Sequence, residues 1–148
     1  MPHVANRRPV MVLALTTTLA AAAAVSASVA SAQPRLVGKP AAALAPAIAS
    51  NTVMVVFRLD HPLRRRANGS LPARVTLAGH HYSVGTLRAS RHCYVSYVTG
   101  SSGTRPLRFR AGRSYPIVVV SEDQPIFTGT VTVRKAAHRA RTVRSVGC

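Results

Sequence analysis

Cysteine and histidine are the residues of this 148-residue chain with the most versatile side-chain chemistry. Cys93 and Cys148 are its only cysteines, and His80, His81 and His92 precede the first of them. A thiolate beside an imidazole could act as a nucleophile, and both groups bind metal ions. On an extended chain, however, successive side chains point to opposite faces, so neither His80 with His81 nor His92 with Cys93 can share a local site.

A blue-copper site would need a second His and a Met shortly after its cysteine. Neither residue type follows Cys93 at a useful distance. His61 and His138 lie among basic residues, without the spacing of metal ligands. We therefore expect no metal site and no cofactor.

A secreted cysteine enzyme is the alternative interpretation of Cys93, because Thr86 and Leu87 precede it in an arginine-rich chain. This arrangement resembles that of sortases, which use Cys, His and Arg. In sortases the Thr-Leu pair lies closer to the cysteine than it does here, and this chain is short for that role. We therefore expect no catalytic residue and no enzymatic activity.

Acidic residues are rare, since Asp60, Glu122 and Asp123 stand against 20 Lys and Arg residues. The formal net charge is +17 and the sequence pI is about 11.9. Three carboxylates, two of them adjacent, do not provide the separated pair that glycosidases use or the oxygen ligands that calcium needs.

The first 32 residues have the three-part layout of a secretory signal peptide. Arg7 and Arg8 precede an apolar run at 10–25, and small residues at 30–32 suit a signal peptidase that cleaves before Gln33. Cleavage would leave 116 residues with a formal charge of +15. We expect a secreted or extracytoplasmic protein, with an uncleaved N-terminal anchor at the cell surface as the alternative. The bias toward Arg over Lys and the Ala-rich composition indicate a GC-rich bacterial host.

Export would place both cysteines in an oxidising compartment, where disulfide formation is the default. We therefore expect Cys93 and Cys148 to form one disulfide. For a loop of this length the chain-entropy model gives a stabilisation of about 4 kcal/mol. That amount is comparable with the whole stability of a small domain.

The exported part of the chain changes character at about residue 51. Residues 33–51 are rich in Ala and Pro and predict a flexible lead-in, whereas 52–148 predict a single β domain. The β-branched run 52–59 is typical of a central strand that is buried on both faces. The other predicted strands are 74–78, 81–88, 93–98, 106–110, 116–120 and 126–133. About seven strands without long helices predict an all-β fold, a small antiparallel β-sandwich with one disulfide.

Residues 109–120, FRAGRSYPIVVV, resemble the loop-to-strand passage of immunoglobulin-like and fibronectin-like domains. The resemblance covers these residues alone and implies the general sandwich architecture. The chain has no Trp, which immunoglobulin domains carry in their core, so the resemblance implies no binding site.

Basic side chains cluster in three stretches of the predicted β domain. On the predicted strand 106–110, Arg108 and Arg110 would lie on the face opposite Leu107 and Phe109. Guanidinium groups bind phosphate and carboxylate groups bidentately, so we expect binding to an anionic polymer or an anionic lipid surface that weakens with salt. The expected polyanion-binding residues are Arg64, Arg65, Arg66, Arg105, Arg108, Arg110, Arg113, Arg134, Lys135, Arg139, Arg141 and Arg144.

Two other kinds of partner are alternatives to an anionic polymer. Aromatic side chains that could stack on bases are few, so we do not expect specific nucleic-acid recognition. A protein-interaction or adhesion module, in which strand edges bind and the charge is incidental, is the competing interpretation. One contiguous basic face would favour polyanion binding, whereas an even scatter of arginines would favour a solvated coat. The sequence predicts no oligomeric state.

Overall fold

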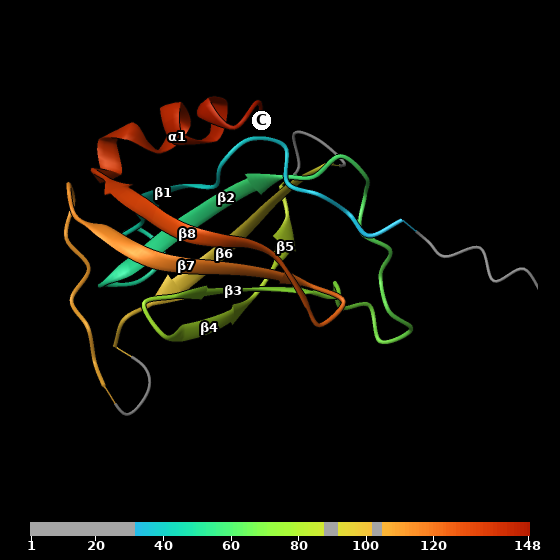
Figure 1. Ribbon diagram of the computed structural model, residues 1–148. Helices are drawn as coiled ribbons and strands as arrows, with labels where there is room; N and C mark the ends of the chain where they lie inside the picture. Colours follow the sequence, from blue (N-terminus) through green and yellow to red (C-terminus); the bar gives the residue numbers. More distant parts are fainter. Residues whose placement is uncertain (1–31, 88–91, 102–104) are drawn as a thin grey trace, which may run out of the picture. The chain divides into compact units, whose positions relative to one another are not determined.

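The computed structural model describes residues 32–87, 92–101 and 105–148, which form a predominantly β unit (Figure 1). The predicted signal peptide, apart from Ala32, and the last residue of the predicted strand 81–88 lie outside the described residues. The strands are β1 (Ala41–Leu44), β2 (Thr52–Arg58), β3 (Ala73–Leu77), β4 (His80–Ser83), β5 (Gly85–Thr86), β6 (Cys93–Thr99), β7 (Ser114–Ser121) and β8 (Gln124–Arg134). A 3-10 turn, η1 (Ala136–His138), and a helix, α1 (Arg139–Ser145), follow β8.

The eight strands form one sheet in the order β4-β3-β7-β8-β1-β2-β6-β5. All neighbours are antiparallel except β1 and β8, which are parallel. The two outer strands are consecutive in the chain, because the backbone passes from β4 to β5 at the buried Val84. Ser96 of β6 donates a side-chain hydrogen bond to the carbonyl of Ser83 in β4 (2.9 Å). The sheet therefore curls into a nearly closed, barrel-like form.

The prediction of an all-β domain with one disulfide is confirmed, but the strands are arranged differently from the expected sandwich. The predicted strand 81–88 is divided at Val84, so that its first part pairs with β3 and its second part with β6. The prediction of a strand at 106–110 is wrong, since these residues pair with no strand. Helix α1 has no counterpart in the sequence analysis.

Strand β1 lies within residues 33–51, where the sequence predicts a flexible lead-in. Its sequence, AAAL, has little intrinsic β propensity. The strand forms because β8 and β2 supply hydrogen-bond partners on both of its edges. The residues of 33–51 themselves give no indication that β2 and β8 will pair with them.

The core has two parts, separated by β2 and its neighbours. Val53, Val55 and Phe57 point into the barrel, whereas Met54 and Val56 pack on the opposite face beneath the C-terminal segment. The prediction that this strand is buried on both faces is therefore confirmed. Other residues packed in the barrel interior include Val75, Leu77, Tyr94, Val98, Ile117, Val119, Val131 and Val133.

No bilayer-crossing helix occurs in the described part of the chain. Helix α1 has seven residues, whereas a span needs about 20 apolar ones.

Candidate functional site

The predicted polyanion-binding residues do not form one group, because the barrel separates them. In the β7–β8 hairpin, Ser114 pairs with Thr132 and Ser121 pairs with Gln124. The start of β7 and the end of β8 therefore lie at the same end of the barrel, which the chain from β6 to β7 also reaches (Figure 1). We name this the basic end, and its basic residues are Arg105, Arg108, Arg110, Arg113, Arg134 and Lys135.

Backbone contacts bring two separate stretches of the sequence together at the basic end. Gly112 donates its N–H to the carbonyl of Val133 (2.8 Å), and Val133 donates to the carbonyl of Arg113 (2.9 Å). The turn before β7 is thus fixed beside Arg134, the last residue of β8. The Tyr115 hydroxyl accepts the N–H of Arg110 (2.9 Å) and holds the same turn.

Helix α1 carries the remaining basic residues of the C-terminal segment away from the basic end. Arg139 is its first residue, and Arg141 and Arg144 follow along the helix. Arg134 Nη1 and Arg139 Nε are buried and have no hydrogen-bond partner within the described residues. A buried polar group without a partner is costly. Each of these two guanidinium groups therefore has one buried nitrogen for which the described chain supplies no acceptor.

Two of the three acidic residues lie at the far end of the β7–β8 hairpin. Glu122 and Asp123 form its two-residue turn, and both have the positive φ (50° and 62°) of a type I′ turn. At about 3.3 Å per residue, this turn lies roughly 23 Å from the start of β7. These carboxylates are therefore too far away to neutralise the basic end.

The predicted group Arg64, Arg65 and Arg66 also lies at the end that carries the acids. These residues belong to the loop between β2 and β3, and Arg66 lines a small hollow with Asp123. The ion pairs of the described residues join Asp60 with His61 (2.9 Å) and Asp123 with Arg74 (3.5 Å). None of them includes a residue of the basic end. The structure thus separates a basic end without acids from an end of mixed charge.

Residues 106–109 are held in place by one asparagine. The Asn51 side chain donates to the carbonyl of Leu107 (2.5 Å) and accepts the N–H of Phe109 (2.8 Å). Gly100 accepts the N–H of Leu107 (2.7 Å) and donates to the carbonyl of Asn51 (3.1 Å). Asn51 has a φ of 57°, a left-handed conformation in which Asn is enriched. This network replaces the strand pairing that the sequence predicts for 106–110.

The predicted alternation of side chains along 106–110 is confirmed, although the predicted strand is not. Phe109 is buried and Leu107 half-buried, whereas Arg108 and Arg110 are exposed. The ring of Phe109 packs edge-on against Tyr115, with the centroids 5.2 Å apart. An apolar anchor on one side of the segment therefore displays arginine on the other.

A hollow of about 610 Å³ lies between this segment and the β1–β2 connection, at the basic end. Small-molecule sites commonly measure roughly 300–1,000 Å³. Apolar residues from both elements line it, and Arg108 is the one charged residue in the lining. The lining residues are Leu44, Pro46, Ser50, Asn51, Thr52, Ser101, Pro106, Leu107, Arg108 and Phe109.

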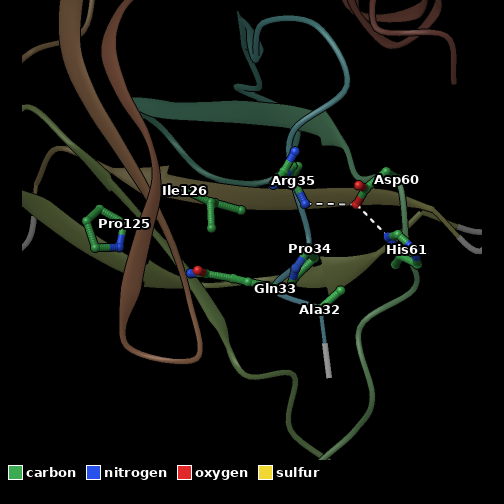
Figure 2. A pocket seen from close by; sticks show the side chains of 8 residues that line it. All are labelled: Ala32, Gln33, Pro34, Arg35, Asp60, His61, Pro125 and Ile126. Carbon is green, nitrogen blue, oxygen red and sulfur yellow. Dashed lines mark hydrogen bonds and ion pairs between the residues drawn. The ribbon is translucent and has the colours of Figure 1, made fainter. Parts of the chain in front are cut away.

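A second hollow, of about 460 Å³, lies at the end of mixed charge (Figure 2). On one side of it Asp60 accepts the backbone N–H of Arg35 (2.8 Å) and pairs with Nδ1 of His61 (2.9 Å). Pro125 and Ile126 lie across from them in Figure 2. A carboxylate with an imidazole is the orienting part of a hydrolytic triad, but none of the described lining residues is a Ser, Thr or Cys that could serve as nucleophile.

The hydrogen bond from Arg35 N–H, followed by that from His61, holds the pKa of the Asp60 carboxyl below its ordinary value. The ionised form is therefore favoured in the folded protein, and its stabilising effect is present above the ordinary pKa of about 3.9. This effect is lost as the pH falls through the folded-state pKa. We expect urea denaturation between pH 5 and pH 3 to show a steeper loss of stability for the native chain than for Asp60→Asn. Parallel curves would contradict this assignment.

The predicted disulfide between Cys93 and Cys148 is confirmed, with the two Cα atoms 6.0 Å apart. The sulfur of Cys93 is therefore not available as the thiolate that the cysteine-enzyme alternative requires. His80 is half-buried, with its ring 6.3 Å from that of Phe109, and His81 bonds Thr76 (2.7 Å). Among the described residues, no three His, Cys, Asp or Glu side chains are grouped as metal ligands would be.

Comparison with known proteins identifies no family for this chain. No protein-family model matches it, and no curated protein matches it.

Proposed function

We propose that this protein is a non-enzymatic binding domain, exported through its N-terminal signal, whose basic end binds an anionic polymer of the cell envelope or the extracellular surroundings. The observation that carries the proposal is the separation of charge. Six basic residues meet at one end of the barrel, and all three acids lie elsewhere. Like charges gathered without counter-charges repel each other, and a polyanion relieves that repulsion.

The geometry favours phosphate or carboxylate groups on a repeating chain. The arginines of the turn before β7 are exposed, and backbone hydrogen bonds fix that turn beside the end of β8. A prearranged set of guanidinium groups loses little entropy when it binds, and each group can contact an anion bidentately. The resulting affinity is largely electrostatic, so it falls steeply as salt rises.

Two triple variants with the same loss of charge test this proposal. The first, Arg108→Gln with Arg110→Gln and Arg113→Gln, removes three cations from the basic end. The matched control, Arg64→Gln with Arg65→Gln and Arg66→Gln, removes three from the other end. We expect the first to weaken binding to long-chain polyphosphate at least tenfold, since a charge-assisted contact contributes about 1 kcal/mol or more. The control is expected to lose less than threefold.

Calorimetric titration at several salt concentrations provides the measurement. The salt dependence of the first variant is expected to be shallower than that of the native chain, because fewer counterions are released. Equal losses in the two variants would show that net charge alone drives binding, and would contradict a site at the basic end. Polyphosphate binding that persists undiminished at high salt would contradict the electrostatic proposal.

A further inference from the structure

We infer that the ligand of the basic end is an amphipathic anion, whose apolar part enters the hollow beside Arg108 while its charged group binds the arginines outside. This inference rests on the proposed function and narrows the class of ligand. The shared chemistry is an acyl or similar apolar chain next to a carboxylate or phosphate. It differs from a plain polyanion, which would use the arginines alone.

The composition of the hollow favours a ligand with an apolar part. Leu44, Pro46, Pro106, Leu107 and Phe109 contribute apolar surface to a space of about 610 Å³, whereas a purely ionic site would need little such surface. Water in contact with these five apolar side chains finds no hydrogen-bond partner in them, so displacing it with an apolar group is favourable. The volume is sufficient for a medium-length chain.

One wall of the hollow belongs to a connection that carries an exposed hydrophobic side chain. Ile48 is 54% exposed, and Val37 is the other large hydrophobic residue exposed among the described residues. Ile48 belongs to the β1–β2 connection, whose Pro46 and Ser50 line the hollow. Ile48 therefore adds exposed apolar surface to the connection that forms one wall of the hollow.

Hydrogen bonds fix the wall of the hollow formed by residues 106–109 before any ligand binds. Asn51 bonds both Leu107 and Phe109, and Gly100 bonds Leu107, so the outer wall is tied to the start of β2 and the end of β6. A preformed site saves the ordering cost that a flexible loop would incur on binding. Arg108 projects from this wall with no ion-pair partner among the described residues, which makes it complementary to an anionic head group.

Calorimetric titration with three small probes below their micellar concentrations tests the inference on the full exported domain. Decanoate carries both the chain and the charge, acetate only the charge, and decyltrimethylammonium the chain with the opposite charge. We expect one decanoate per protein, no measurable binding of acetate, and at least tenfold weaker binding of decyltrimethylammonium. Equal binding of decanoate and decyltrimethylammonium would overturn the role of the arginines.

Variants then locate the probe. Ser50→Trp fills the hollow without changing the charge, and Arg108→Gln removes its one cation. We expect each to weaken decanoate at least tenfold, with Arg64→Gln unchanged as the charge control. Ile48→Ser is expected to weaken decanoate about threefold, with Val37→Ser as its matched control. Far-ultraviolet circular dichroism verifies that each variant is folded.

Polyphosphate binding by the same variants separates this inference from the proposed function. We expect Ser50→Trp to retain native affinity for polyphosphate, because it leaves every arginine in place. Polyphosphate binding without decanoate binding would overturn the inference and leave the proposed function standing. Decanoate binding without polyphosphate binding would overturn the polymer proposal. Decanoate binding that is unchanged by Ser50→Trp would overturn the assignment of the hollow.

Discussion

The double variant Cys93→Ala with Cys148→Ala is expected to lose about 4 kcal/mol of unfolding free energy, because the disulfide closes a long loop in the unfolded chain. The two cysteines are 55 positions apart, and Cys93 is fully buried on β6. Alanine is preferred to serine at this buried position, since an unpaired hydroxyl would add a cost of its own. A loss of this size approaches the whole stability of many small domains.

The disulfide also holds the C-terminal segment on the outside of the sheet. Val146 packs against the outer face of β2 near Met54 and Val56, with Val143 partly buried beside them. A seven-residue helix is too short to be stable alone, so it depends on this packing and on the covalent link. We therefore expect the double variant to lose helical circular dichroism before the β signal on addition of urea.

Urea denaturation with and without reductant provides the measurement and its control. The native chain in reductant is expected to unfold at nearly the same urea concentration as the double variant. The unfolding midpoint of the double variant is expected to be the same with and without reductant. A native chain whose transition does not move in reductant would contradict the stabilising role of the disulfide. Polyphosphate affinity of the folded variant is expected to change little, because the two substitutions leave every basic residue in place.

Gly100→Ala is expected to destabilise the fold by about 3 kcal/mol, at the upper end of the range for overpacking. A Cβ atom at this position would collide with the backbone carbonyl oxygen of Leu107 and would lie 2.8 Å from Nδ2 of Asn51. A carbonyl oxygen cannot rotate away as the end of a long side chain can, so the whole segment 106–109 would have to move. The hydrogen bonds between Gly100, Asn51 and Leu107 would be lost with it.

Gly85→Ala is the matched control for this substitution. Gly85 lies in β5, and the nearest atom to an added Cβ, the carbonyl oxygen of Val95, is at 3.9 Å, an ordinary contact. We expect its unfolding free energy to change by less than about 0.5 kcal/mol. Equal destabilisation of the two variants in urea would contradict the close approach at Gly100. Gly100→Ala is also expected to weaken decanoate binding, because it displaces a wall of the hollow.

The sequence predicts much of the barrel because strand formation leaves a local signal. The runs 52–59, 116–120 and 126–133 alternate or are continuously apolar, and they coincide with most of β2, β7 and β8. At 106–110 the same pattern predicts a strand that does not form. Alternation of apolar and polar side chains can arise in any extended segment that packs on a core, whether or not it pairs with a strand. There Asn51 and Gly100 supply the hydrogen bonds that a neighbouring strand would otherwise provide.

The twelve basic residues of the candidate site show the same division. Their identity and clustering are visible in the sequence, and so is the scarcity of acids. In the structure they are divided among the basic end, the loop at 64–66 and helix α1, and this division depends on how the strands pair in the sheet. No local pattern specifies the order of the strands, so Arg64 and Arg108 look alike in the sequence but lie at opposite ends of the barrel.

The sequence by itself determined the β-rich class, the pairing of the only two cysteines, and the excess of positive charge. These features follow from composition and from periodicity over a few residues. The tertiary structure alone decided that β1 forms, that the sheet turns at Val84 to close, and that a hollow opens beside Arg108. Each of these depends on contacts between distant segments, such as that of Asn51 with Leu107 and Phe109, and the free energy of such contacts is set by the folded chain as a whole.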